Sequence, residues 1–243
     1  MKIIRILAAL GLAVPVIALA VALPIAGPAS AEGEKLPQTL HFTSDVPTGI
    51  VAFARYGAAV TAESSSGLPV TLSVEPGNPV CSVGPEPPFI HGNVGIGHAG
   101  TCTVYADQAG DDQYAPAERI EMSFEVGRVP TGLFAAKASK GALGLTPTTF
   151  RAALRYDGWF GPNEATLPFP GQLVTFSVAG KTMCSATTVY VQDDTVFGEF
   201  FGSAIATCKA PIGLANALKQ STYTATFAGT PDYLPSTATG VLK

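Results

Sequence analysis

Four cysteines are the residues whose type and spacing carry the clearest chemistry in this sequence. Cys81 and Cys102 lie in the first half of the chain, and Cys184 and Cys208 lie in the second. Neither pair has the C-x-x-C spacing of a thioredoxin-type redox site, and a zinc site would require the two pairs to meet. Sequence alone allows three pairings, and a division into two domains favours the local one, Cys81 with Cys102 and Cys184 with Cys208. In an oxidising compartment, each such bridge stabilises its domain by about 3 kcal/mol.

The run GIGHAG at residues 95–100 matches the dinucleotide-binding fingerprint G-x-G-x-x-G. That fingerprint holds a pyrophosphate only where a helix begins directly after the glycines. The residues that follow here are TCTVYA, which have the composition of a β-strand. We therefore predict a hairpin connection into the Cys102 strand, and no nucleotide or other cofactor.

The acidic and basic side chains do not form a recognisable catalytic set. Glu121 and Glu125 share one face of a predicted strand, but they lie roughly 13 Å apart, beyond the carboxyl spacing of about 5–9.5 Å in glycosidases. The sequence has no G-x-S-x-G elbow, and His41, His91 and His98 match no nucleophile pattern. We predict a protein that is not an enzyme and has no catalytic residues. A hydrolase is the third alternative, because a Ser/His/Asp site can assemble from residues that are distant in the sequence.

Metal binding is a weaker alternative for the remaining polar residues. His91 and His98 could meet across a hairpin, and Asp111–Asp112 or Asp193–Asp194 could offer oxygen ligands to calcium. The Asp pairs lack EF-hand spacing, and Asp in tight turns ordinarily forms local hydrogen bonds. The prediction is that there is no metal site.

Aromatic residues gather in two Gly-rich stretches of the second half and form a candidate binding patch. Its members are Trp159, Phe160, Tyr190, Phe197, Phe200 and Phe201. On exposed loops, such side chains stack on sugars or fill a partner's pocket. The alternative is that they pack under the loops or between domains, and the sequence leaves this open.

The N-terminus has the features of a cleaved signal peptide. Lys2 and Arg5 precede a long apolar run, and Ala29-Ser30-Ala31 follows with the small residues of a cleavage site. A membrane anchor is the alternative, although Pro15 and Pro24 interrupt the run. Removing residues 1–31 leaves 12 basic and 18 acidic residues, a net charge of −6. An acidic chain does not suit nucleic-acid binding, and no membrane span is predicted in the mature chain.

Short alternating runs separated by Gly, Pro, Asn or Asp predict an all-β protein. The first series lies between residues 36 and 126, residues 127–132 form a linker, and the second series lies between 133 and 243. In the first series, Cys102, Val104 and Ala106 are expected to point inward. Residues 211–220 are interpreted equally well as a short helix or a loop. The expected strands are 39–44, 56–64, 69–75, 80–83, 89–94, 101–107 and 119–126, then 133–139, 148–157, 172–178, 182–192, 204–209, 221–229 and 237–242.

Both series resemble bacterial Ig-like repeat domains of secreted and cell-surface proteins. In the first, the resemblance rests on QTLHF (38–42), SGLPVTLS (66–73), Cys81, AGTCTVYADQAGDDQYAPA (99–117) and SFEV (123–126). In the second, more divergent series it rests on PGQLVTFSV (170–178), CSATT (184–188), TC (207–208), YTATFAG (223–229) and DYLPS (232–236). The stretch between the cysteines of the second series is longer and more aromatic than is usual in this family.

The resemblance implies two tandem Ig-like Greek-key β-sandwiches and an extracellular or cell-wall-associated location. It implies no catalytic residues, and a role in binding, adhesion or structural spacing. The expected partner is an extracellular protein or glycan of unknown identity. The alternative function is carbohydrate or cell-wall recognition through the aromatic loops of the second domain.

Overall fold

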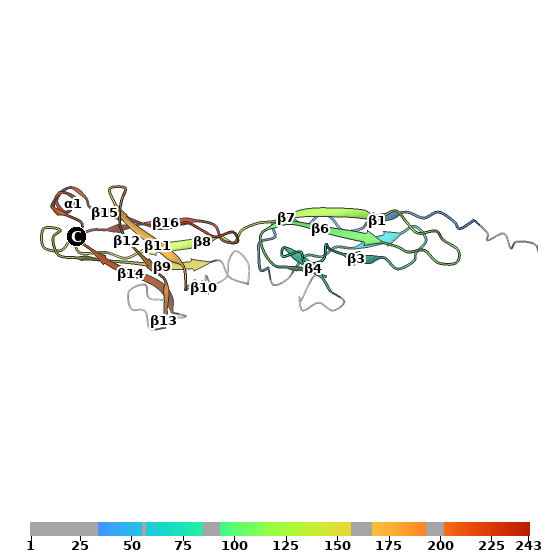
Figure 1. Ribbon diagram of the computed structural model, residues 1–243, viewed down its shortest axis with the longest axis horizontal. Coiled ribbons are helices and arrows are strands. Elements are labelled where there is room, and N and C mark those ends of the chain that lie inside the picture. The colour runs from blue at the N-terminus through green and yellow to red at the C-terminus, as the bar shows by residue number, and fades with distance from the viewer. Residues whose placement is uncertain (1–33, 55–56, 85–92, 157–166, 193–201) are drawn as a thin grey trace, which may run out of the picture. The chain divides into compact units, whose positions relative to one another are not determined.

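The computed structural model describes residues 34–54, 57–84, 93–156, 167–192 and 202–243 (Figure 1). The regular structure of the described chain is antiparallel β-sheet with almost no helix, which confirms the all-β prediction. Its helical content is one element, α1 (Leu214–Lys219). No helix among these residues has the length and apolar character required to cross a bilayer. The predicted signal peptide, residues 1–31, lies outside the described residues.

The first half contains short paired strands on two sides of one core. On one side, β1 pairs with β2 and β4 pairs with β5, and a bridge between Ala58 and Val94 connects the chain before β2 to β5. On the other side, the strand order is β3-β6-β7. The bounds are β1 (Leu40–Phe42), β2 (Ala62–Ser64), β3 (Thr71–Ser73), β4 (Cys81–Val83), β5 (Val94–Ile96), β6 (Gly100–Asp107) and β7 (Ile120–Val126).

Alternation along β6 and β7 builds this core. Cys102, Val104 and Ala106 are fully buried, while their neighbours Thr101 and Thr103 face outward, as predicted. Every second residue of β7 is buried in the same way. Since successive strand side chains point to opposite faces, one apolar face is enough to fix the register of the pair.

The second half contains two further sheets around a separate core. One has the order β8-β9-β14-β13, with β10 paired to the end of β9, and the other has the order β12-β11-β15-β16. The bounds are β8 (Thr131–Ala135), β9 (Thr148–Tyr156), β10 (Leu167–Pro168), β11 (Leu173–Val178), β12 (Lys181–Thr187), β13 (Val189–Val191), β14 (Ser203–Ala210), β15 (Thr222–Phe227) and β16 (Ser236–Val241).

Three aromatic rings form the centre of this second core. Phe150 lies 5.8 Å from Phe176 and 5.0 Å from Tyr223, measured between ring centroids. The Tyr223 hydroxyl lies 2.5 Å from the carbonyl oxygen of Ala136 and 3.0 Å from that of Arg151. Burial raises the pKa of Tyr223 to about 12, so the phenol stays neutral and donates its proton to these carbonyls.

The predicted strand 182–192 is divided into two strands that belong to different sheets. β12 ends at Thr187, and β13 begins at Val189. Between them Thr188 is buried, its hydroxyl donating to the Phe169 carbonyl at 2.8 Å and accepting from the Gln172 amide at 2.9 Å. These bonds satisfy a polar side chain at the point where the chain leaves one sheet for the other.

Candidate functional site

Each disulfide joins the two sheets of its own core. Cys81 of β4 bonds Cys102 of β6, and Cys184 of β12 bonds Cys208 of β14. The pairing is the local one of the three that the sequence allows, and no cysteine is free. Since all four sulfur atoms are in bridges, none of them is available as a zinc ligand or as a reactive thiol in this oxidised state.

The GIGHAG run connects the two sheets of the first half. β5 pairs with β4, whereas β6, which follows, pairs with β3 and β7. The predicted hairpin is therefore wrong, because β5 and β6 lie in different sheets. A Cβ atom on Gly97 would overlap the Pro79 carbonyl oxygen, so glycine is required there by close backbone contact. A strand follows instead of a helix, so the phosphate-binding geometry is missing.

A histidine–carboxylate pair forms between segments that are far apart in the sequence. His98 Nδ1 lies 2.8 Å from Asp232 Oδ2, and the Ala99 amide donates to Asp232 Oδ1 at 2.8 Å. Burial raises the pKa of Asp232, but the hydrogen bonds from Ala99 and His98 outweigh it and hold the pKa below its usual value. The Phe53 ring packs edge-on against His98, with its centroid 5.4 Å away.

His98 and Asp232 are arranged like the histidine and carboxylate of a catalytic triad. The other described contacts of the pair are the Ala99 amide and the Phe53 ring. Among the described residues, no hydroxyl or thiol hydrogen-bonds the His98 ring. The loop that carries Asp232 is instead tied to the chain at Val129, whose amide donates to the Asp232 carbonyl at 2.7 Å and whose carbonyl accepts from the Leu234 amide at 2.9 Å. The arrangement holds two segments together. His91, which could meet His98 in the metal-site alternative, lies outside the described residues.

The acidic residues singled out in the sequence have local roles where they are described. The Glu125 carboxylate accepts a hydrogen bond from Thr101 Oγ1 at 2.7 Å on the outer face of the sheet. Asp111 accepts from the amides of Gln113 and Tyr114, each at 2.8 Å, and these bonds lower its pKa. No three His, Cys, Asp or Glu residues within the described ranges gather into a possible metal site.

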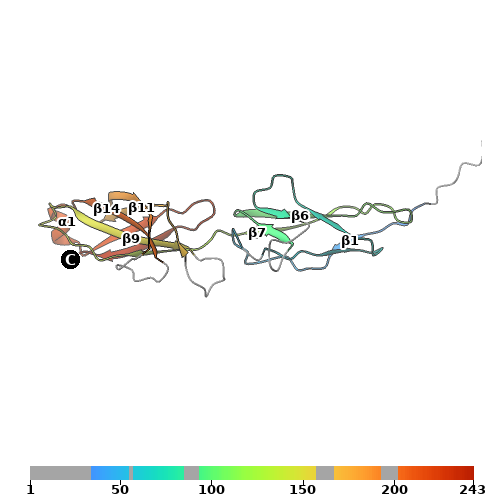
Figure 2. The same ribbon diagram turned by 90° about the horizontal axis from the view of Figure 1, so that it is seen from below.

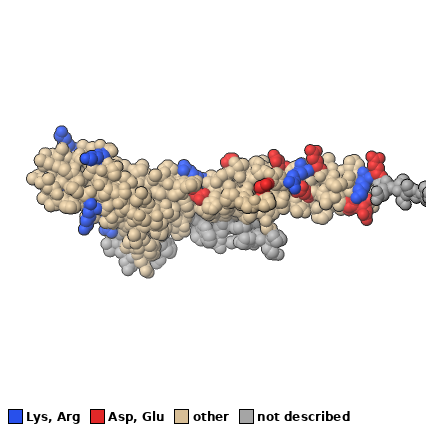
Figure 3. All heavy atoms as spheres, in the orientation of Figure 1, with Lys and Arg blue, Asp and Glu red and all other residues tan. Residues whose placement is uncertain are grey.

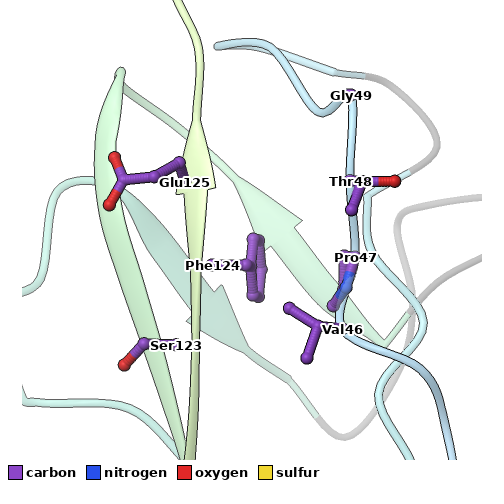
Figure 4. Close-up of a pocket in the computed structure, with 7 residues that line it drawn as sticks. All are labelled: Val46, Pro47, Thr48, Gly49, Ser123, Phe124 and Glu125. Carbon is purple, nitrogen blue, oxygen red and sulfur yellow. The ribbon is translucent and has the colours of Figure 1, made fainter.

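A groove of about 410 Å³ runs between segment 46–49 and β7 (Figure 4). Val46, Pro47, Thr48 and Gly49 form one wall, and Ser123, Phe124 and Glu125 form the other. Figure 4 shows the Phe124 ring pointing toward Val46, whereas the side chains of Ser123 and Glu125 point to the other side of β7. The floor of the groove is therefore apolar.

One wall of this groove is a strand edge. β7 is the last strand in the order β3-β6-β7. The Gly127 amide donates to the Ile50 carbonyl, and the Gly127 carbonyl accepts from the Ala52 amide. Backbone groups alternate in direction along a strand, so those of Ser123 and Glu125 point to the same side of β7 as those of Gly127. Within the described chain, no strand pairs with that side of β7 at Ser123 and Glu125. Sequence reasoning missed this groove, because it depends on where segment 46–49 separates from β7.

The predicted aromatic patch is described at one of its six positions. Tyr190 lies in β13, and 48% of it is exposed. A Cβ atom on Gly202 would lie 2.8 Å from the Tyr190 hydroxyl, so glycine lets the chain pass close to this ring. Trp159, Phe160, Phe197, Phe200 and Phe201 lie outside the described residues.

Comparison with known proteins gives no family assignment. No protein-family model matches the sequence. No curated protein matches it either.

Proposed function

We propose that this chain is a non-enzymatic extracellular module made of two Ig-like Greek-key β-sandwiches, residues 36–126 and 133–243 joined by 127–132. Its role is to bind or space other molecules at the cell surface or cell wall. The disulfide between the two sheets of each core, buried in the first half and partly buried in the second, carries this proposal. Such bridges persist in oxidising compartments and stabilise small β-sandwiches there.

The order of the strands supports the Ig-like part of the proposal. In the first half, the first, second, fifth and fourth strands lie on one side of the core, and the third, sixth and seventh on the other. This is the arrangement of constant-type immunoglobulin domains. The second half repeats it in β8-β9-β14-β13 against β12-β11-β15-β16, where β12 is an added strand.

The groove beside β7 supports binding over spacing alone. An extended segment of a partner can lie along a free strand edge and form main-chain hydrogen bonds, while its side chains contact an apolar floor. The outer face of the same sheet carries Glu121 and Glu125 next to threonine and serine side chains. Such a polar surface beside the groove keeps the free edge soluble.

The test begins with the exported protein. Mass spectrometry of its unreduced peptides must return the Cys81–Cys102 and Cys184–Cys208 links; free thiols or links between the two halves would contradict the proposed modules. Capture from cell-surface extract is then compared for the wild type, for Val46→Asp in the groove, and for Leu173→Asp as an exposed control outside it. If only Val46→Asp loses capture, the result supports binding at β7. If the wild type and both variants are captured equally, binding takes place elsewhere.

Carbohydrate or cell-wall recognition is the second proposal, and exposed Tyr190 on β13 favours it. Aromatic rings held on a rigid sandwich stack on sugar faces. Trp159→Ala combined with Phe200→Ala should abolish co-sedimentation with cell-wall material and leave the melting temperature unchanged. Undiminished co-sedimentation would count against this proposal.

A further inference from the structure

The second half of the chain presents four exposed leucines on two neighbouring segments, loop 141–147 and helix α1. Leu143, Leu145, Leu214 and Leu218, here called the leucine tip, expose 62, 71, 48 and 70% of their surface. Leu214 and Leu218 lie four residues apart on one helical face, while Ala217 beside them is buried in the core. Exposed apolar patches, unlike single exposed apolar residues, mark protein or membrane interaction sites.

The loop is docked onto the helix and displays its leucines from a defined position. The Gly213 amide donates to the Gly144 carbonyl at 3.0 Å. A Cβ atom on Gly144 would lie 2.9 Å from the Ala217 Cβ, so a glycine is needed for this approach. Within the loop, the Ala142 amide donates to Thr146 Oγ1 at 2.7 Å.

Leu143 is held in a backbone conformation that does not favour leucine. Its φ is +51°, in the left-handed region that bulky side chains rarely adopt. Since 62% of the residue is exposed, burial in this chain does not compensate for the strain. Strained positions cluster at binding sites, where the displayed side chain has a use.

Several lysines lie on the segments that adjoin the leucine tip. The Lys140 amide donates to the Lys243 carbonyl at 2.7 Å, and Lys219 ends α1 itself. The pairing of Ser177 with Thr224 places the turn before Lys181 at the same end of the sheet. Figures 1 and 2 both show α1 beside the C-terminus, and Figure 3 shows Lys and Arg but no Asp or Glu on the drawn face of this end.

The described residues give these lysines no acidic neighbours from their own half. Between 133 and 243, Asp232 is the acidic residue that the structure describes, and it is bonded to His98 and Ala99. The other acidic residues of this half lie outside the described residues: Asp157, Glu164, Asp193, Asp194 and Glu199. The leucine tip is thus an apolar surface whose adjoining segments, as far as they are described, carry lysines and no acidic residue of the second half.

We propose that the leucine tip is a peripheral membrane-binding site for anionic lipid bilayers. The four leucines enter the boundary between headgroups and acyl chains, and the lysines around them contact headgroup phosphates. Lysine suits this position because its aliphatic stem packs along apolar surface while its ammonium group remains at the headgroups.

The charge pattern favours a bilayer over a protein as the occupant. Protein interfaces surround an apolar centre with a rim of mixed polarity, whereas an anionic leaflet is uniformly negative and attracts basic residues over its whole area. Binding then rises with buried apolar area and with the number of lysines near the surface. No protein surface of fixed shape is required.

The test measures co-sedimentation of residues 35–243, which form one compact unit, with vesicles. This fragment is used because the apolar run before it would itself enter lipid. Vesicles of equal parts phosphatidylglycerol and phosphatidylcholine are compared with vesicles of phosphatidylcholine alone. Leu145→Ser combined with Leu218→Ser should weaken binding to the anionic vesicles by at least about tenfold, because the serine side chains bury almost no apolar surface among the acyl chains. Leu173→Ser with Val189→Ser, at 59 and 63% exposure elsewhere, is the matched control and should bind normally.

A second pair of variants tests the lysines. Lys140→Gln with Lys219→Gln should weaken binding to anionic vesicles by about tenfold and reduce its dependence on salt. Melting curves for every variant establish that the fold is kept. Absence of wild-type sedimentation with anionic vesicles, or binding that survives the leucine variant, would overturn the proposal. Self-association that disappears in the leucine variant, without vesicle binding, would assign the tip to a second copy of the chain.

Discussion

Removing the first disulfide should destabilise one half of the chain and leave the other unchanged. Cys81→Ala with Cys102→Ala opens a loop whose ends are 21 residues apart, which costs about 3 kcal/mol on the chain-entropy estimate. Cys81 is 3% exposed and Cys102 is 0% exposed, so the lost sulfur atoms add a packing loss of about 1 kcal/mol. The expected total of about 4 kcal/mol corresponds to a fall in Tm of roughly 15–30 °C for a domain of this size.

Hydrogen-exchange mass spectrometry through a guanidinium titration can report this loss for each half separately. Amides in β6 and β7 should lose protection at lower denaturant, while amides in β9 and β14 keep theirs. Cys184→Ala with Cys208→Ala, the matched control, should produce the reverse pattern. An equal loss in both halves would show that the two cores unfold as one unit, and a change below 1 kcal/mol would refute the role given to the bridge.

Three further perturbations test contacts made by residues of the second half. Tyr223→Phe should lower the free energy of unfolding by about 1–2 kcal/mol, because the phenol no longer donates to buried carbonyls; denaturant titration measures this. Because the pKa of Tyr223 rises from 10.0 to about 12 on folding, the wild-type advantage over Tyr223→Phe should be complete below pH 10 and disappear as pH rises through 12. Gly240→Ala should destabilise by about 1–3 kcal/mol in thermal melts, since its Cβ would overlap the Tyr223 ring, whereas exposed Thr239→Ala should not. Asp232→Asn should be less stable than wild type at neutral pH, and the difference should vanish in acid titrations below pH 3.8, because the folded carboxyl has the lower pKa.

Alternating patterns in the sequence predicted the strands because they report which side chains are buried. Cys102 and the apolar residues that alternate with it face the core for this reason, and the local cysteine pairing followed from the division of the chain into two series. Periodicity does not report which sheet receives a strand. It therefore missed the crossover at Gly97 and the change of sheet at Thr188, which depend on a carbonyl contact and on two hydrogen bonds to distant residues.

Parts of the candidate sites depend on tertiary placement that local sequence does not encode. His98 and Asp232 are 134 residues apart, and nothing near either residue indicates the pair. Leu214 and Leu218 have the spacing of a helical face that packs inward. In the structure, the smaller Ala217 beside them takes the buried position, and the leucines remain at the surface.

The two disulfides also limit how far the chain can lengthen when it is pulled from both ends. Each bridge lets force pass directly from one sheet to the other, so residues 82–101 and 185–207 carry no tension. The two bridges therefore shorten the fully extended length of the chain by about 140 Å. Reduction of the two bridges would release that length and let the chain extend further under the same force.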